Sequence, residues 1–110
     1  MIKNFAKFKE LAQSSKIPCK EAEYSKSVNP PFAAYFRAEE RGIYADSQLI
    51  ETIVTVIIEL YTAKADEKSE RAFEKWLADN EIPAKKTRRT WITEEKFYCT
   101  IYEAEMIEFG

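Results

Sequence analysis

The strongest pattern along the chain is the alternation of side chains over residues 51–62, a run rich in β-branched residues and free of glycine and proline. Alternate side chains of a strand point to opposite faces, so this run predicts one long strand. One face would be wholly apolar and carries Val54, Val56, Ile58 and Leu60. The other face would mix apolar and polar side chains and carries Ile53, Thr55, Ile57, Glu59 and Tyr61. We expect the apolar face to be covered, and we take Ile53, Thr55, Ile57 and Glu59 as candidate residues of a subunit interface.

Two segments have the spacing of an amphipathic helix. In the first, residues 2–13, the apolar positions are Ile2, Phe5, Phe8, Leu11 and Ala12. The second begins after Asp66, a suitable N-cap, and has an apolar stripe made of Ala72, Phe73, Trp76 and Leu77. Asn80 and Pro83 are expected to end it.

The other strands are marked by aromatic and β-branched runs between turn residues. We expect an extended segment after Ile17-Pro18, a strand over residues 32–37, a turn over residues 39–42 and a return that begins at residues 43–47. Two later strands are expected over residues 90–93 and 96–107, after a basic connection at residues 85–89.

The order helix, strands, helix, strands predicts an α+β fold, an antiparallel sheet of four to five strands with two helices packed mainly on one face. An arrangement with one helix on each face remains open. Helices on one face would leave the other face exposed, and an exposed apolar patch marks an interaction site. At 110 residues, without repeat or linker, the chain is expected to form a single domain over residues 1–110.

The balance of charges limits the classes of partner. The 17 basic and 19 acidic residues give a net charge of −2, which provides no overall attraction to DNA or to an anionic membrane. The longest apolar run, Ile53–Ile58, is interrupted by Thr55 and is too short to span a bilayer, so no membrane partner is expected. The first residues lack the continuous apolar core of a signal peptide, and we expect the protein to remain inside the cell.

Residue types needed for common catalytic sites are scarce. The chain has no histidine, which excludes Ser-His-Asp and Cys-His arrangements. Its only glycines, Gly42 and Gly110, cannot form a phosphate-binding loop. Cys19 and Cys99 lack metal-site spacing, so we expect two buried thiols in a reducing cytosol, without zinc or any other cofactor.

The acidic pairs Glu94-Glu95 and Glu103/Glu105 have residue types that suit acid–base chemistry or Mg²⁺. Exposed acids are the default, however, and we expect Glu103 and Glu105 on the solvent side of an edge or in an oligomer contact. The prediction is therefore a protein that is not an enzyme.

The sharpest local charge is the run KKTRR at residues 85–89, followed by Trp91. Lys85, Lys86, Arg88, Arg89 and Trp91 are candidate contacts for DNA or for an acidic partner. The plainer interpretation is a solvated connecting loop. The run supports an alternative function, a small nucleic-acid-binding or regulatory module.

Four segments in order, PPFAAYFRAEE, YADSQLIETIVTVIIELYT, ERAFEKWLADNEIP and WITEEKFYCTIYEAEMI, carry a wider pattern. Over roughly residues 15–108 the chain resembles the small tail-completion proteins (tail terminators, head–tail joining proteins) of long-tailed bacteriophages and prophages of Gram-positive bacteria. The matching positions are Pro31, Phe32, Tyr35, Tyr44, Ala45, Asp46, Glu59, Leu60, Tyr61, Thr62, Glu95, Tyr98, Tyr102 and Glu103. The segment at residues 51–62 is more apolar than the polar one typical of that family.

The resemblance implies a non-enzymatic virion component that caps the tail tube as a ring, commonly a hexamer. Its partners would be further copies of itself, the major tail protein and head-completion proteins, with DNA only incidental. It would be found in the bacterial cytoplasm during assembly and then in the tail or neck of the virion. The pattern does not separate a tail terminator from a neighbouring head-completion protein.

Overall fold

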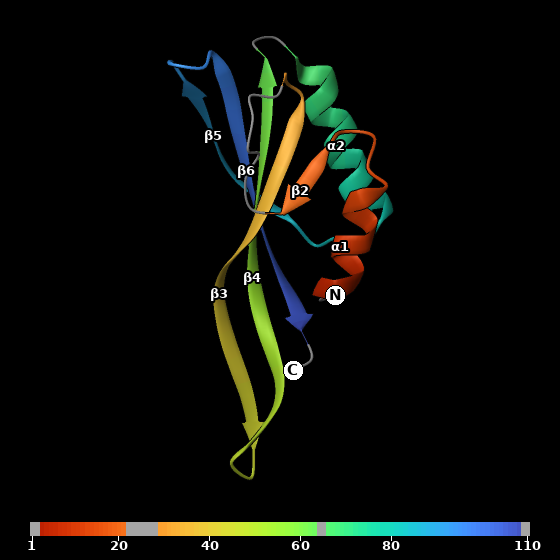
Figure 1. The fold of residues 1–110 in the computed structure, drawn as a ribbon, viewed down its shortest axis with the longest axis vertical. Helices are drawn as coiled ribbons and strands as arrows, with labels where there is room; N and C mark the ends of the chain where they lie inside the picture. The colour runs from red at the N-terminus through yellow and green to blue at the C-terminus, as the bar shows by residue number, and fades with distance from the viewer. Residues whose placement is uncertain (1–2, 22–28, 64–65, 109–110) are drawn as a thin grey trace.

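The computed structural model describes residues 3–21, 29–63 and 66–108, whose arrangement is shown in Figure 1. In chain order these residues form β1 (Lys3–Asn4), α1 (Phe5–Gln13), β2 (Cys19–Glu21), β3 (Phe32–Ala45), β4 (Gln48–Ala63), α2 (Glu67–Asp79), β5 (Lys85–Ile92) and β6 (Phe97–Glu108). This is the predicted α+β fold.

The strands form one mixed sheet in the order β1-β6-β4-β3-β2, with β5 also paired to β6. The long strands β3, β4, β5 and β6 pair with one another in the antiparallel sense, as predicted. The short strands β1 and β2 add to β6 and β3 in the parallel sense, which the sequence pattern did not indicate.

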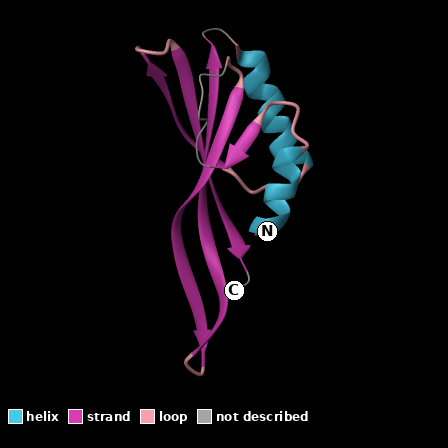
Figure 2. Ribbon diagram, in the orientation of Figure 1, coloured by secondary structure: helices cyan, strands magenta, loops and turns pink. Residues whose placement is uncertain are grey.

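Both helices lie on the same side of the sheet, as Figure 2 shows. They share one apolar core with the predicted face of β4. The buried side chains of this core from α1, α2 and β4 are Phe5, Phe8, Ala12, Phe73, Leu77, Val54, Val56, Ile58 and Leu60. The arrangement with one helix on each face is therefore excluded.

Each helix begins at a side-chain cap. Asp66 accepts a hydrogen bond from the Ser69 amide at 3.1 Å, which confirms the predicted cap of α2. Asn4 accepts one from the Lys7 amide at 3.1 Å, so α1 begins at Phe5 rather than at residue 2. Ile2 lies outside the described residues. Neither of the two described helices has the length and apolar character needed to cross a membrane.

The turn predicted at residues 39–42 is wrong, because β3 continues through these residues to Ala45. The reversal is a two-residue turn at Asp46-Ser47, between the paired residues Ala45 and Gln48. Asp46 and Ser47 have φ angles of 51° and 65°, the left-handed values of a type I′ turn, whose twist matches that of the flanking strands. Gly42 instead lies within β3.

The prediction of a basic connection at residues 85–89 is also wrong, because these residues belong to the strand β5, Lys85–Ile92. It pairs with β6 from Lys85↔Glu103 to Ile92↔Phe97, with an irregularity between Lys86 and Arg88. Sequence propensity failed here because a run of charged residues suits an edge strand as well as a loop.

Candidate assembly surfaces

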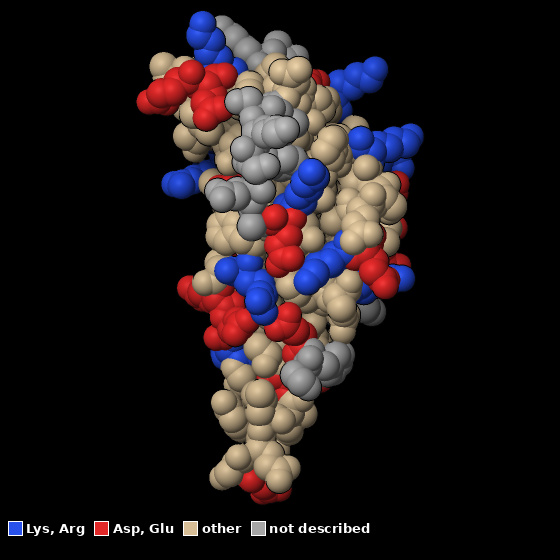
Figure 3. Space-filling view, in the orientation of Figure 1, with Lys and Arg blue, Asp and Glu red and all other residues tan. Residues whose placement is uncertain are grey.

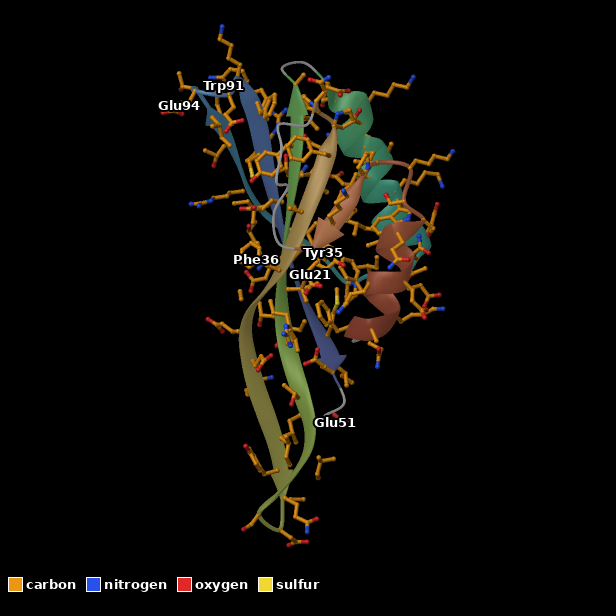
Figure 4. All side chains as sticks on the ribbon, viewed as in Figure 1. Glu21, Tyr35, Phe36, Glu51, Trp91 and Glu94 are labelled. Atoms are coloured by element: carbon orange, nitrogen blue, oxygen red, sulfur yellow. The ribbon has the colours of Figure 1, made fainter. Side chains whose placement is uncertain are left out.

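The four candidate interface residues of β4 lie on the face of the sheet that neither helix covers, which we call the outward face. Ile57 pairs with Phe36 of β3 on one side and with Glu103 of β6 on the other. Thr55, Ile57 and Glu59 are half-buried, whereas Ile53 is only 8% exposed. Phe36, next to the buried Tyr35 on β3, is 38% exposed; both are labelled in Figure 4.

A polar groove of about 630 Å³ opens on this side of the molecule. Residues from β3, β4, β5 and β6 line it, together with Pro83. Its charged side chains are Glu39, Arg41, Lys85, Glu103 and Glu105. Arg41 pairs with Glu105 at 3.6 Å, while Lys85, Glu39 and Glu103 form no ion pair within the described part of the chain.

The second surface is the end of the β3–β4 hairpin, residues 43–51, which we call the arm. The last described pair between β4 and β6 is Thr52↔Glu108, so the arm is a two-stranded ribbon that extends beyond the sheet (Figure 1). It carries four exposed apolar side chains, with exposed fractions of 38% for Ile43, 66% for Tyr44, 51% for Leu49 and 55% for Ile50. Because a two-stranded ribbon is only marginally stable in water, such a display of apolar surface indicates an interaction site.

Gly42 sets the orientation of two of these side chains. A Cβ at Gly42 would lie 2.9 Å from Leu49 Cδ1 and 2.9 Å from Tyr44 Cε2. Tyr44 and Leu49 are also register partners. The missing side chain therefore lets Tyr44 and Leu49 lie together on one face of the arm.

The basic residues of β5 are divided between the two faces of the sheet. Lys86 and Arg89 pair in register with Tyr102 and Thr100 on the helix side, and Lys85 and Arg88 lie on the outward face. Only the second pair, Lys85 and Arg88, is without an ion pair among the described residues. The five candidate DNA contacts thus do not form one continuous basic surface.

Lys86 and Arg89 are held by the acidic side chains of α2. Lys86 Nζ lies 2.6 Å from Glu70 Oε2 and 2.7 Å from Glu74 Oε2, and Arg89 Nε lies 3.2 Å from Glu70 Oε1. Glu70 is 4% exposed, so these cations neutralise a buried carboxylate. Lys86 and Arg89 therefore dock α2 on the sheet.

The same network shifts two pKa values. Burial tends to lower the pKa of Lys86, but its hydrogen bonds to Glu70 and Glu74 raise the pKa above the ordinary value. Burial tends to raise the pKa of Glu74, yet hydrogen bonds from Lys86, Tyr102 and Arg71 lower it below the ordinary value. Both groups are therefore held in their charged forms.

Trp91 packs against Tyr98 at a distance of 4.8 Å between ring centroids. The Arg89 guanidinium lies 4.0 Å from the centroid of the same Tyr98 ring. Trp91 is still 38% exposed. It belongs first to an aromatic cluster at the end of the sheet where β5 and β6 turn (Figure 4).

The acidic side chains of both pairs are exposed, as expected for Glu103 and Glu105. Glu94 and Glu95 occupy the β5–β6 turn, and Glu103 and Glu105 are exposed on β6. In the described residues, no group of three or more His, Cys, Asp or Glu side chains has the geometry to hold a metal ion.

Cys19 and Cys99 are free and buried, as predicted. Burial raises the pKa of the Cys19 thiol to about 12 and that of Cys99 to about 11. Both thiols are therefore protonated at neutral pH and poor nucleophiles.

The positions that match the tail-completion pattern have mainly packing roles where described. Tyr35 packs edge-on against Phe8 at 4.8 Å, and the Tyr102 hydroxyl donates to Glu74 at 2.8 Å. On the outward face, the Tyr61 hydroxyl donates to Glu59 at 3.0 Å. Tyr44 and Asp46 lie in the arm. The pattern thus combines residues of the sheet with residues of its most exposed end.

Comparisons of the chain with family models, with curated proteins and with solved structures found no match.

Two features of the site were not predicted from sequence. The arm was missed because Gly42 resembles a turn residue, although the YADSQ segment contains the two small polar residues of the real turn. The α2–β5 network was missed because its residues are distant in sequence. Its one local signal is the spacing of Glu70 and Glu74, which places both acids on one face of α2.

Proposed function

We propose that this protein is a non-enzymatic structural subunit of a phage or prophage tail or neck, a tail-completion protein that assembles into a ring at the end of the tail tube and joins the tail to the head. The ordered match of segments to that family supports the proposal. The observation that supports it most directly is an outward sheet face with half-buried Ile57 that continues into an arm with four exposed apolar side chains.

The outward face and the arm are suitable surfaces for assembly into a ring. If either of them binds a different part of a neighbouring subunit, the two sides of the contact are not the same surface, so the contact is heterologous. Heterologous contacts close into a ring when the rotation between neighbours divides a full turn. A protein that functions through such contacts needs surfaces of this kind rather than a catalytic pocket.

The direct test uses tail tubes of the phage or prophage that encodes the protein. Purified protein is added to tubes assembled from the major tail protein, and tube ends are examined by negative-stain electron microscopy. We expect a ring at one end of the tube and an arrest of further elongation there. Tubes whose ends and elongation are unchanged by saturating protein would overturn the proposal.

The alternative, a nucleic-acid-binding module, has weaker support. Lys86 and Arg89 are committed to Glu70, which leaves Lys85 and Arg88 for phosphate contacts. Two contacts give a shallow dependence of DNA affinity on salt, with a slope of about −2 in a log–log plot. DNA binding with a slope of about −2 that is lost in the variant Lys85→Ala/Arg88→Ala would favour the alternative.

A further inference from the structure

The arm needs a binding site, and the helix side of the molecule contains a suitable groove. This groove, of about 440 Å³, lies between the end of α1 and the side of α2. It is lined by Ser14, Ser15, Lys16, Ile17, Ala72, Phe73, Lys75, Trp76, Asp79 and Asn80. Ile17 and Trp76 are partly buried hydrophobic residues that pack on the core and leave apolar surface in the groove.

We propose that the arm of one copy inserts Tyr44 and Leu49 into this helix groove of a second copy. The inference rests on the proposed function, because it names the contact that would join neighbouring subunits. The volume is in the range that proteins use to bind small ligands, enough to accept two large side chains. Tyr44 and Leu49 already lie on one face of the arm, so they are oriented together for insertion.

Charge favours the helix groove as the binding site of the arm over the polar groove on the outward face, which we call the outward groove. The arm contains Asp46 and Glu51 and has no basic residue. Figure 3 shows this end of the molecule as largely uncharged, with acidic atoms at its tip. The helix groove has two basic residues, Lys16 and Lys75, and one acid, Asp79. Lys75 pairs with Asp79 at 2.8 Å, so the positive charge left for the arm is that of Lys16, which forms no ion pair with any described residue.

The outward groove has the opposite character. Three glutamates, Glu39, Glu103 and Glu105, line it against two basic residues, Arg41 and Lys85. An acidic arm would be repelled there and attracted to the rim of the helix groove.

The geometry also excludes insertion of the arm into its own groove. The molecule is 52 Å long, with the arm at one end and the helices beside the other half (Figure 1). The contact is therefore intermolecular and heterologous. Each arm–groove contact would be weak by itself, and closure of a ring would make the assembly strong through multivalency.

Cross-linking between two variants tests this contact. Gln48→Cys places a thiol beside the exposed turn of the arm, and Ala72→Cys places one on the exposed wall of the helix groove. The native thiols are buried, and the wild-type protein measures their background. The two variants are mixed and treated with a short bismaleimide. The matched control mixes Gln48→Cys with Glu94→Cys, a thiol in the exposed β5–β6 turn outside the groove.

We expect at least about tenfold more cross-linked heterodimer from the groove mixture than from the control, because a formed contact raises the local thiol concentration to the millimolar range. Adding Tyr44→Asp and Leu49→Asp to the Gln48→Cys chain should remove this excess, whereas Tyr44→Phe and Leu49→Met should preserve it. Equal yields in the two mixtures, or an excess that survives the aspartates, would overturn the inference.

The outcome is separable from that of the proposed function. A ring that forms without the arm–groove cross-link would overturn this contact and leave the proposed function intact. A specific cross-link in a protein that does not cap tail tubes would establish the contact and overturn the tail-completion function.

Discussion

At the scale of the residue, the buried carboxylate Glu70 explains two of the four basic residues of the KKTRR run. These two, Lys86 and Arg89, neutralise it from β5, and Lys86 also reaches Glu74. A buried charge without partners costs several kcal/mol, so these pairs position α2 rather than simply add stability. A charge run that suggests a ligand can thus be internal structure.

Glu74→Gln tests the electrostatic part of this network. The folded-state pKa of Glu74 is lowered, so its contribution to folding is present above the unfolded pKa near 4.5 and is lost as the pH falls through the folded pKa. We expect the variant to lose about 1 kcal/mol of unfolding free energy at pH 7, and the difference from wild type to shrink as the pH falls below 4.5. Urea denaturation at a series of pH values measures both.

Glu67→Gln is the matched control, because Glu67 is exposed and its one ion pair among the described residues is with Arg71, at 3.6 Å. Its effect should be within about 0.5 kcal/mol at every pH. A Glu74→Gln loss that stays constant down to acid pH would mean that the packing of Glu74, not its charge, is what matters.

At the scale of the element, periodicity identified the secondary structure where burial is regular. The alternation in β4 predicted which side chains face the helices. The stripes of α1 and α2 predicted their buried faces, except that Ala72 of the α2 stripe is exposed. Periodicity failed at the arm and at β5, where the residues are exposed and no core imposes a period. The half of the candidate site on β4 could be found from sequence. The half in the arm was missed because Gly42, which lies within β3, led to a predicted turn at residues 39–42 instead of Asp46-Ser47.

Substitutions of Ser47 test the type I′ turn at the end of the arm. A residue with a side chain is strained at a φ of 65°, so Ser47→Gly should stabilise the arm by about 0.5 kcal/mol, and Ser47→Val should destabilise it by about 1 kcal/mol. The arm opens locally, so the amide hydrogen exchange of Ala45 and Gln48 is the appropriate measurement. Slower exchange in Ser47→Val than in Ser47→Gly would contradict the type I′ turn.

At the scale of the whole molecule, the two faces of the sheet differ. The helix side contains the apolar core, whereas neither helix covers the outward face. Ile57 and Ile58 are neighbours in β4 on opposite sides of this division, half-buried and fully buried respectively.

The matched pair Ile57→Glu and Ile58→Glu tests that division. Ile57→Glu should change the unfolding free energy by no more than about 1 kcal/mol but prevent assembly, because a charge replaces apolar contact surface. Ile58→Glu should cost about 4 kcal/mol or more, because its carboxylate would lie in the core. Thermal unfolding and sedimentation velocity distinguish the two effects. If Ile57→Glu unfolds the protein, Ile57 is a core residue and the interface lies elsewhere.

We propose that this protein functions by assembling with itself. The most direct measurement is the absolute mass in solution, from size-exclusion chromatography with multi-angle light scattering over a wide range of protein concentrations. We expect the wild-type protein to form a closed oligomer of defined mass at high concentration. The double variant Tyr44→Asp/Leu49→Asp should remain at 12.8 kDa, the mass of one chain. A wild-type protein that stays at 12.8 kDa at every concentration, and also when tail tubes are present, would contradict the proposal.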